Sequence, residues 1–147
     1  MKEQASPPRV IRVVATTVAI RVLVDRAPKG LSKRDTIWTA SVLANAVPQL
    51  GRPKGSFVGK DAGRAVEIGT PSETADVVAT LPGGTLRIRG KSRSAGATEV
   101  LPVVGGTGAF RGVTGTLSIK DIDGGPRSSN IYRLRYPPDS RTVAADS

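Results

Sequence analysis

Regularly spaced segments of alternating or β-branched residues are the feature that most constrains the fold of this chain. In residues 85–93, Leu86 and Ile88 alternate with basic side chains, and residues 130–136 alternate in the same way. Alternation with a period of two is typical of a β-strand with one buried and one exposed face. Seventeen glycines and 11 prolines punctuate the chain, which favours many short strands joined by turns over a helical bundle.

This pattern predicts about eight strands and no helix. Residues 36–47 are ambiguous, because their alanines favour a helix while Thr, Ile, Trp and Val favour a strand, and we interpret them as a strand. Pro102 makes its segment an edge or irregular strand. Short strands of even spacing predict a sandwich or a closed barrel that holds side chains or one small ligand. The expected strands are 9–25 (a long strand or a bent pair), 36–47, 56–69, 74–81, 85–93, 99–104, 112–122 and 130–136.

The length of 147 residues suits a single domain. We place this domain at residues 9–136, with flexible ends at 1–8 and 137–147. The chain has no cysteine and no histidine, which excludes disulfides, thiolate and imidazole metal sites and histidine-based catalytic triads. We therefore expect no metal, and any chemistry must use carboxylates, Tyr, Lys, Arg, backbone amides or the shape of a cavity.

The net charge of +10 allows two interpretations, a surface for nucleic acid or another anion and a surface that only keeps the protein in solution. The cations are spread over separate segments without a run of like charges. A basic nucleic-acid-binding barrel also needs stacking aromatic side chains on its basic face. Tyr132 and Tyr136 alternate away from the neighbouring arginines, so we expect no nucleic-acid partner.

The apolar stretch 10–24 bears on location and assembly. Arg12 and Arg21 interrupt it and no small-residue cleavage site follows, so it resembles neither a secretory signal nor a membrane span. We expect a cytoplasmic protein without a membrane partner. Apolar residues occur at both parities of the stretch, which predicts that both faces are covered, and a homodimer would cover the outer one.

Residues 103–115, VVGGTGAFRGVTG, first suggest a dinucleotide-binding turn. The glycines after Gly106 and Gly108 do not complete G-x-G-x-x-G, and the segment that follows alternates like a strand rather than a helix. No G-K-[ST] follows either, which excludes a P-loop. We interpret the run as a glycine-dependent corner between strands, with Phe110 as a plug and Thr107 bonded to its own backbone.

This corner resembles that of the allene oxide cyclase and dirigent-protein superfamily. The matching residues are Val103, Val104, Gly105, Gly106, Thr107, Gly108, Phe110 and Gly115, and upstream Gly59 and Gly63 are similar to a glycine-bearing strand of that superfamily. The likeness covers roughly residues 57–120 and is closest in character to small bacterial polyketide cyclases. It implies an all-β fold, an eight-stranded antiparallel up-and-down barrel of the calycin type, with a central apolar cavity and no cofactor.

The resemblance also implies a function. Such barrels hold a reactive, flexible molecule in one conformation, so we expect a cofactor-independent cyclase of the Diels–Alderase type. It would close a ring stereoselectively in a linear polyketide-like intermediate that is apolar or weakly anionic. The alternatives are a non-catalytic dirigent-like binding barrel and the basic nucleic-acid-binding barrel. Missing cysteines and a missing secretion signal separate this chain from plant dirigent proteins.

Strand parity then suggests which side chains face the cavity. If Leu86 and Ile88 point inward, the same alternation sends Tyr132 inward and the neighbouring arginines outward. We predict Tyr132 and Asn130 as catalytic hydrogen-bond anchors for the substrate. Asp61 and Glu67 could form an acid–base pair if both side chains point inward, and are otherwise ordinary surface charges. The predicted substrate-binding residues are Trp38, Leu86, Ile88, Leu117, Ile119, Leu134 and Tyr136.

Overall fold

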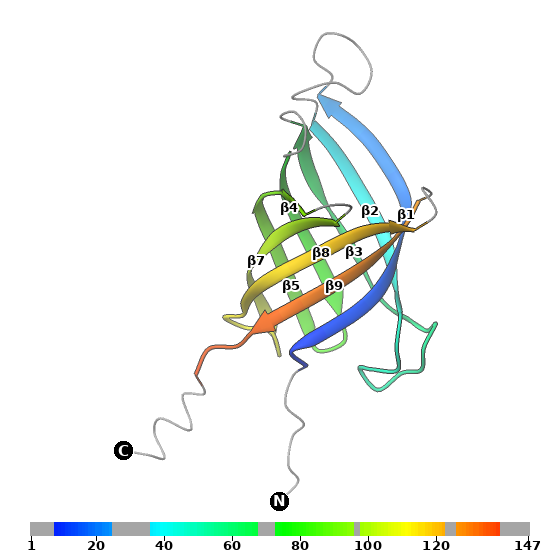
Figure 1. Cartoon of the computed structure of the whole chain (residues 1–147), viewed down its shortest axis with the longest axis vertical. Coiled ribbons are helices and arrows are strands. Elements are labelled where there is room, and N and C mark those ends of the chain that lie inside the picture. Colours follow the sequence, from blue (N-terminus) through cyan, green and yellow to red (C-terminus); the bar gives the residue numbers. More distant parts are fainter. Residues whose placement is uncertain (1–7, 25–35, 68–72, 96–97, 123–125, 139–147) are drawn as a thin grey trace, which may run out of the picture.

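The computed structural model describes residues 8–24, 36–67, 73–95, 98–122 and 126–138. The described chain is all-β, as the alternation predicts, and has no helix (Figure 1). The predicted flexible ends lie outside the described residues, except for Pro8, Pro137 and Pro138. The strands are β1 (Val10–Val24), β2 (Thr36–Asn45), β3 (Phe57–Glu67), β4 (Glu73–Leu81), β5 (Gly84–Lys91), β6 (Arg93–Ala95), β7 (Thr98–Gly108), β8 (Thr114–Ile122) and β9 (Arg127–Arg135).

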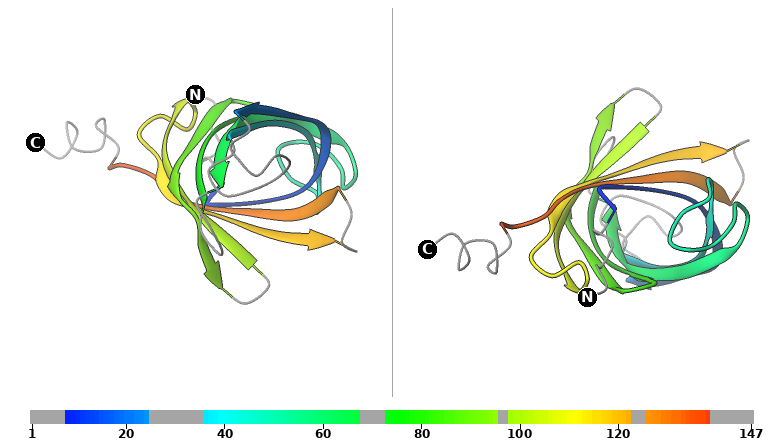
Figure 2. Two further views of the ribbon diagram at one scale, coloured as in Figure 1. Left: turned by 90° about the horizontal axis from the view of Figure 1, so that it is seen from above. Right: turned by 90° about the horizontal axis from the view of Figure 1, so that it is seen from below.

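These strands close into an eight-stranded antiparallel barrel, which confirms the predicted fold. The order is β5-β4-β3-β2-β1-β9-β8-β7-β6, and pairing of β5 with β7 completes the circle. The short β6 pairs only with β7 in the described part of the chain, and Figure 2 shows this hairpin projecting from the barrel wall. No helix among the described residues is long and apolar enough to cross a lipid bilayer.

Strand β1 has one face in the core and one outside. Ile11 and Val13 are fully buried inside the barrel. Val18 and Ile20 are 61% and 62% exposed, so the prediction that both faces of this segment are covered is wrong for the single chain. A register shift between Thr17 and Ala19 changes the parity of the strand. Beyond it, Ile20 pairs with the pocket-lining Thr39, and Arg21 pairs with Trp38.

Two glycines of β3 allow it to approach β4 closely, as their position in a strand predicts. A Cβ atom on Gly59 would collide with the backbone of Thr80, and one on Gly63 with the backbone of Asp76 and Val77. Both positions face the barrel interior, since Gly59 pairs with the buried Leu43. Glycine is therefore required for the tight coiling of the wall.

The Gly-Gly-Thr-Gly run is part of a strand and not the corner itself, which corrects the prediction. Residues 105–108 end β7 and pair with β5, where a Cβ on Gly106 would collide with the backbone of Thr85 and Phe110. Thr107 bonds across the strands, with its Oγ1 2.7 Å from Thr85 Oγ1, instead of bonding to its own backbone. The corner follows at 109–113, and Phe110 is its plug, only 1% exposed.

Strand β7 is also not the short edge strand that Pro102 predicts. It has 11 residues and pairs with both β5 and β8. Proline is tolerated because the β5 pairing begins only at Val103, where a register shift falls between Arg87 and Ile88. The absent N–H group of Pro102 therefore removes no bond to β5.

One end of the barrel is closed by turns. The loop between β2 and β3 is held by Asn45, which is 2% exposed and whose Nδ2 donates to the carbonyl oxygens of Gln49 and Arg52 at 2.9 and 3.1 Å. Leu50 of this loop packs against the core cluster that contains Phe110, and Figure 1 shows the loop and the β7–β8 corner at the same end of the barrel.

Candidate functional site

A pocket of about 250 Å³ lies inside the barrel. Side chains from β1–β5 and β7–β9 line it, because alternate residues of each strand face inward. Its apolar lining comes mainly from β4, β5, β7 and β8 and includes Val77, Ile88, Leu101, Leu117 and Ile119. Its polar lining comes mainly from β1, β2, β3 and β9 and includes Thr17, Thr39, Ser41, Asp61, Ser128 and Asn130.

The pocket therefore has two unlike sides, whereas the resemblance implied an apolar cavity. A molecule inside would lie with one edge against aliphatic side chains and the other against hydroxyl, amide and carboxyl groups. Such a lining orients a ligand, because apolar contact supplies affinity and a few polar groups fix the direction in which it binds.

Asp61 is one of three charged residues that line the pocket, with Asp121 and Arg127. It lies on β3 between Ser41 of β2 and Ala79 of β4, so it points inward. Burial raises the pKa of its carboxyl to about 6, and a hydrogen bond from the Ser41 hydroxyl opposes this rise. No cation is among the causes of the shift. Below about pH 6 this carboxyl group is mainly protonated, and in that form it can donate a hydrogen bond or transfer a proton.

Tyr132 lies on β9 across the barrel from β3 and is fully buried. Burial raises the pKa of its hydroxyl, the Asp61 charge raises it further, and the neighbouring Asn130 opposes both. The hydroxyl nevertheless has no hydrogen bond of normal geometry in the described part of the chain. A buried hydroxyl without a partner is unusual and is costly in a folded protein, so this group is available to a bound molecule or to water.

Asn130 connects the Tyr132 hydroxyl to the pocket. It is 3% exposed and lines the pocket, and its Oδ1 accepts a hydrogen bond from Ser128 Oγ at 2.7 Å. The structure thus brings Asn130, Tyr132 and Asp61 into one region of the barrel. The side chain of Glu67, the other carboxylate considered from the sequence, lies outside the described residues.

The aliphatic residues among the predicted substrate-binding residues separate into two groups. Ile88, Leu117 and Ile119 line the pocket. Leu86 and Leu134 are buried in the core but do not line it. Whether any of these residues binds a substrate stays a prediction.

The two aromatic residues among the predicted substrate-binding residues, Tyr136 and Trp38, do not line the pocket. Tyr136 is half-buried, and its hydroxyl donates to the Pro8 carbonyl oxygen at 2.7 Å, away from the pocket. The placement of Trp38 on the cavity wall is wrong. Its neighbours Ile37 and Thr39 face the pocket, so Trp38 faces outward, where the Arg21 guanidinium lies 5.9 Å from its ring centroid. Arg64 is its partner on β3.

Several pocket residues were missed from the sequence, namely Thr17, Thr39, Ser41 and Ser128. Their inward position depends on strand register, and the one available signal was the matching parity of Thr39 and Ser41 within a single segment. Among the described residues, no three acidic side chains gather in a way that would hold a metal ion.

Comparison with known proteins yields no matching family model and no matching curated sequence. Solved structures do match. A pyocyanin demethylase matches with a TM-score of 0.66 and 17% sequence identity, and the match covers 86% of this chain and 99% of the demethylase. The pterocarpan synthase dirigent protein GePTS1 matches with a TM-score of 0.66 and 17% identity, and the match covers 85% of this chain and 81% of GePTS1. The Diels–Alderase AbmU from Streptomyces koyangensis matches with a TM-score of 0.61 and 14% identity, and the match covers 92% of this chain and 76% of AbmU. At these identities the likeness concerns the fold, and the chain has the barrel fold of dirigent-type proteins that its glycine-rich segment predicts.

Proposed function

We propose that this protein is a cofactor-independent cyclase that holds a linear, polyketide-like molecule in the barrel pocket and promotes stereoselective ring closure. The observation that carries the proposal is the Asp61 carboxyl group, which lies inside the pocket with its pKa raised to about 6. A Diels–Alderase and a dirigent protein are among the structures with this fold, which supports a role in orienting a reactive molecule. The setting we propose is natural-product assembly in the cytoplasm.

In this proposal the two sides of the pocket have separate tasks. The aliphatic side, with Ile88, Leu117 and Ile119, folds the carbon chain so that its reacting atoms meet. Such positioning contributes about 7–11 kcal/mol in the best intramolecular cases. The volume of about 250 Å³ is just below the range typical of small-molecule sites, so the pocket takes the ring-forming part of the substrate.

The polar side activates the substrate. Protonated Asp61 donates a hydrogen bond to a carbonyl group conjugated to the reacting double bond, and Ser41 holds the carboxyl in place. The new bonds form within the substrate, no atom enters or leaves, and the Asp61 proton stays shared between the carboxyl and the carbonyl oxygen. Neither a strong base nor a redox partner is required.

Two further assignments belong to this proposal. A non-catalytic, dirigent-like barrel is the second candidate function, because the dirigent neighbour has the same fold and binding alone requires nothing of Asp61. A second copy of the chain is our proposed protein partner, since Val18 and Ile20 are exposed on β1. We propose no nucleic-acid partner.

Turnover of achiral linear trienes that carry a terminal conjugated ketone tests the function, with the stereoisomers of the cyclic product separated by chiral chromatography. The protein should accelerate closure and give one stereoisomer in excess. Asp61→Leu, which lacks a donor, should lower the rate about 100-fold. The matched control Asp76→Leu changes the carboxylate on the outer face of β4 and should leave the rate unchanged.

The outcomes separate the candidates. Stereochemical control without acceleration, and without an effect of Asp61→Leu, would replace the cyclase with the dirigent-like role. No binding of any such triene would contradict both.

A further inference from the structure

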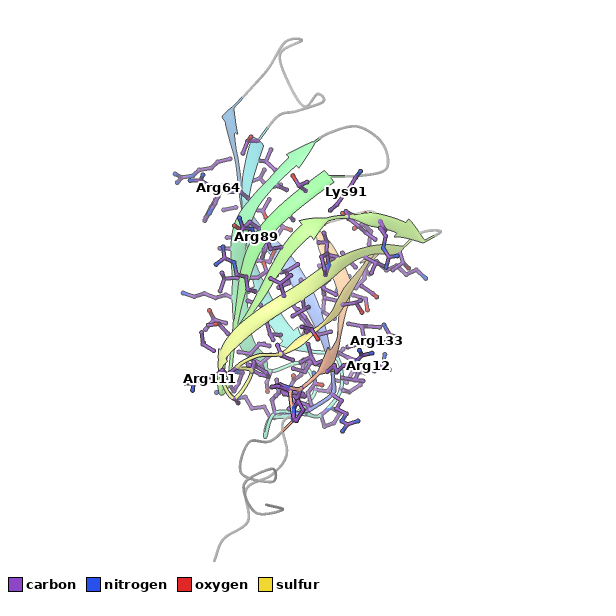
Figure 3. All side chains as sticks on the ribbon, turned by 90° about the vertical axis from the view of Figure 1, so that its left-hand side faces the viewer. Arg12, Arg64, Arg89, Lys91, Arg111 and Arg133 are labelled. Carbon is purple, nitrogen blue, oxygen red and sulfur yellow. The ribbon has the colours of Figure 1, made fainter. Side chains whose placement is uncertain are left out.

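A second hollow, of about 540 Å³, lies on the outer surface where β1, β8 and β9 meet near the closed end of the barrel. Arg9, Arg133 and Arg135 line it together with the hydroxyl-bearing Thr114 and Thr116. It shares no lining residue with the barrel pocket. Figure 3 shows Arg133 and Arg12 on the same side of the molecule, with Arg64 and Arg89 on the other.

Strand register gathers these side chains. Arg133 pairs with Thr116 and Arg135 with Thr114, so alternate residues of two neighbouring strands face outward as a row of arginines beside a row of threonines. Arg9 joins them because its carbonyl oxygen accepts a hydrogen bond from the Leu134 amide at 2.7 Å. The cluster therefore rests on a paired sheet rather than on a loose loop.

The three arginines have no carboxylate partner among the described residues. The ion pairs of the described chain involve Asp76, which lies 3.1 Å from Arg87 and 3.9 Å from Arg89 on another part of the wall. Arg133 has only a long hydrogen bond of 3.4 Å to the Ser118 hydroxyl. Like charges held together without a counter-charge repel each other, and a bound anion relieves that repulsion.

We propose that this outer hollow binds the phosphate or diphosphate group of a small molecule. Guanidinium groups bind phosphate oxygens in a bidentate manner, and threonine hydroxyls add further donors. A volume of about 540 Å³ exceeds what one phosphate fills, and Val10 at its edge offers apolar contact to an organic group. The described lining contains no aromatic side chain on which a base would stack, which favours a small phosphate ester over a polynucleotide.

Titration of the full chain with inorganic pyrophosphate at near-physiological salt, followed by amide ¹H–¹⁵N NMR, tests the site. Saturable shifts should concentrate at Arg9, residues 114–116 and residues 133–135. The double substitution Arg133→Gln/Arg135→Gln should raise the Kd about tenfold or more. The control Arg87→Gln/Arg89→Gln removes the same charge elsewhere and should leave the Kd within about twofold. Both pairs are exposed, and unchanged spectra elsewhere verify folding.

Equal weakening by the two double substitutions would overturn the proposal, because attraction by net charge alone would then explain the binding. Shifts spread over the whole basic surface, or no saturation, would overturn it as well. A parallel titration with a short-chain alkyl diphosphate identifies the source of the anion. Tighter binding than pyrophosphate assigns an organic phosphate, and equal binding assigns the free anion.

Discussion

Asp61 and Asp76 lie on neighbouring strands, yet the barrel gives them opposite environments. Asp61 faces the pocket, where burial raises its pKa to about 6 and the Ser41 hydroxyl opposes the rise. Asp76 faces outward, 44% exposed, beside Arg87 at 3.1 Å. The two strands are in contact through paired residues, so the difference arises only from which face of the sheet each side chain occupies. In this fold, parity and register decide whether a carboxyl group can do chemistry.

The largest effect should come from filling the inner face where β3 approaches β4. A side chain in Gly63→Val would collide with the backbone of Asp76 and Val77, and we expect a loss of about 4 kcal/mol or more in the free energy of unfolding. Ala62→Val, on the outer face next to it, should change stability by about 0.5 kcal/mol or less. Urea unfolding of both variants measures this, and equal losses would contradict the assigned faces.

The next effect should be a pH-dependent stability that belongs to Asp61. The folded pKa of about 6 exceeds the ordinary value of 3.8, so the folded state binds more protons between these values. Unfolding free energy should fall as pH rises from about 4 to 6, by up to about 3 kcal/mol. Asp61→Asn should remove this fall and be the more stable protein at pH 7, whereas Asp76→Asn should keep it. Denaturant unfolding across this pH range provides the measurement, and a wild-type curve that does not fall would refute the expectation.

A smaller contrast concerns the two tyrosines. The Tyr132 hydroxyl has no hydrogen bond of normal geometry among the described residues, so Tyr132→Phe should leave stability unchanged or raise it slightly. The Tyr136 hydroxyl donates to the Pro8 carbonyl oxygen at 2.7 Å, and Tyr136→Phe should cost about 1 kcal/mol. Thermal unfolding distinguishes the two. A clear loss for Tyr132→Phe would mean that its hydroxyl is already satisfied, by Asn130 or by ordered water.

The smallest effect should follow from changing Trp38. Its ring lies outside the barrel, under Arg21 at 5.9 Å, and such an exposed cation–π contact contributes about 0.5–1 kcal/mol. Trp38→Phe should therefore leave the affinity of the pocket for an apolar ligand unchanged, as isothermal titration calorimetry can measure. A marked loss of affinity would indicate that Trp38 faces the cavity after all.

Sequence patterns predicted the fold better than the site. Clean alternation in 85–93 and 130–136 correctly placed Ile88 and Tyr132 inside the barrel and Arg133 outside. In residues 36–47 both parities carry apolar side chains, so the pattern did not exclude Trp38 from the wall. The glycines at 105–108 predict a corner where the structure has a strand, because glycines required by close packing of two strands resemble glycines required by a turn.

The polar side of the pocket could not be predicted, for a physical reason. Ser41 and Asp61 meet because β2 and β3 pair in one register, and a single sequence carries no record of which residues lie opposite each other. The raised pKa of Asp61 depends in turn on burial by the whole barrel. The inward position of Asn130 and Tyr132, by contrast, follows from the sequence, because residues 130–136 alternate without interruption.

The most direct test of the central claim is the carboxyl titration of Asp61, followed by ¹³C NMR on the wild-type protein with Asp61→Asn as the assignment control. We expect a midpoint near pH 6, and turnover that declines as pH rises through this value. Asp61→Asn, which keeps an amide donor, should retain part of the turnover without the decline. A midpoint near 3.8, the ordinary value for an aspartate, would mean that the group is solvated and already charged at about pH 5, where the proposal needs it protonated. It could then not donate a proton to a substrate, and the proposed chemistry would be wrong.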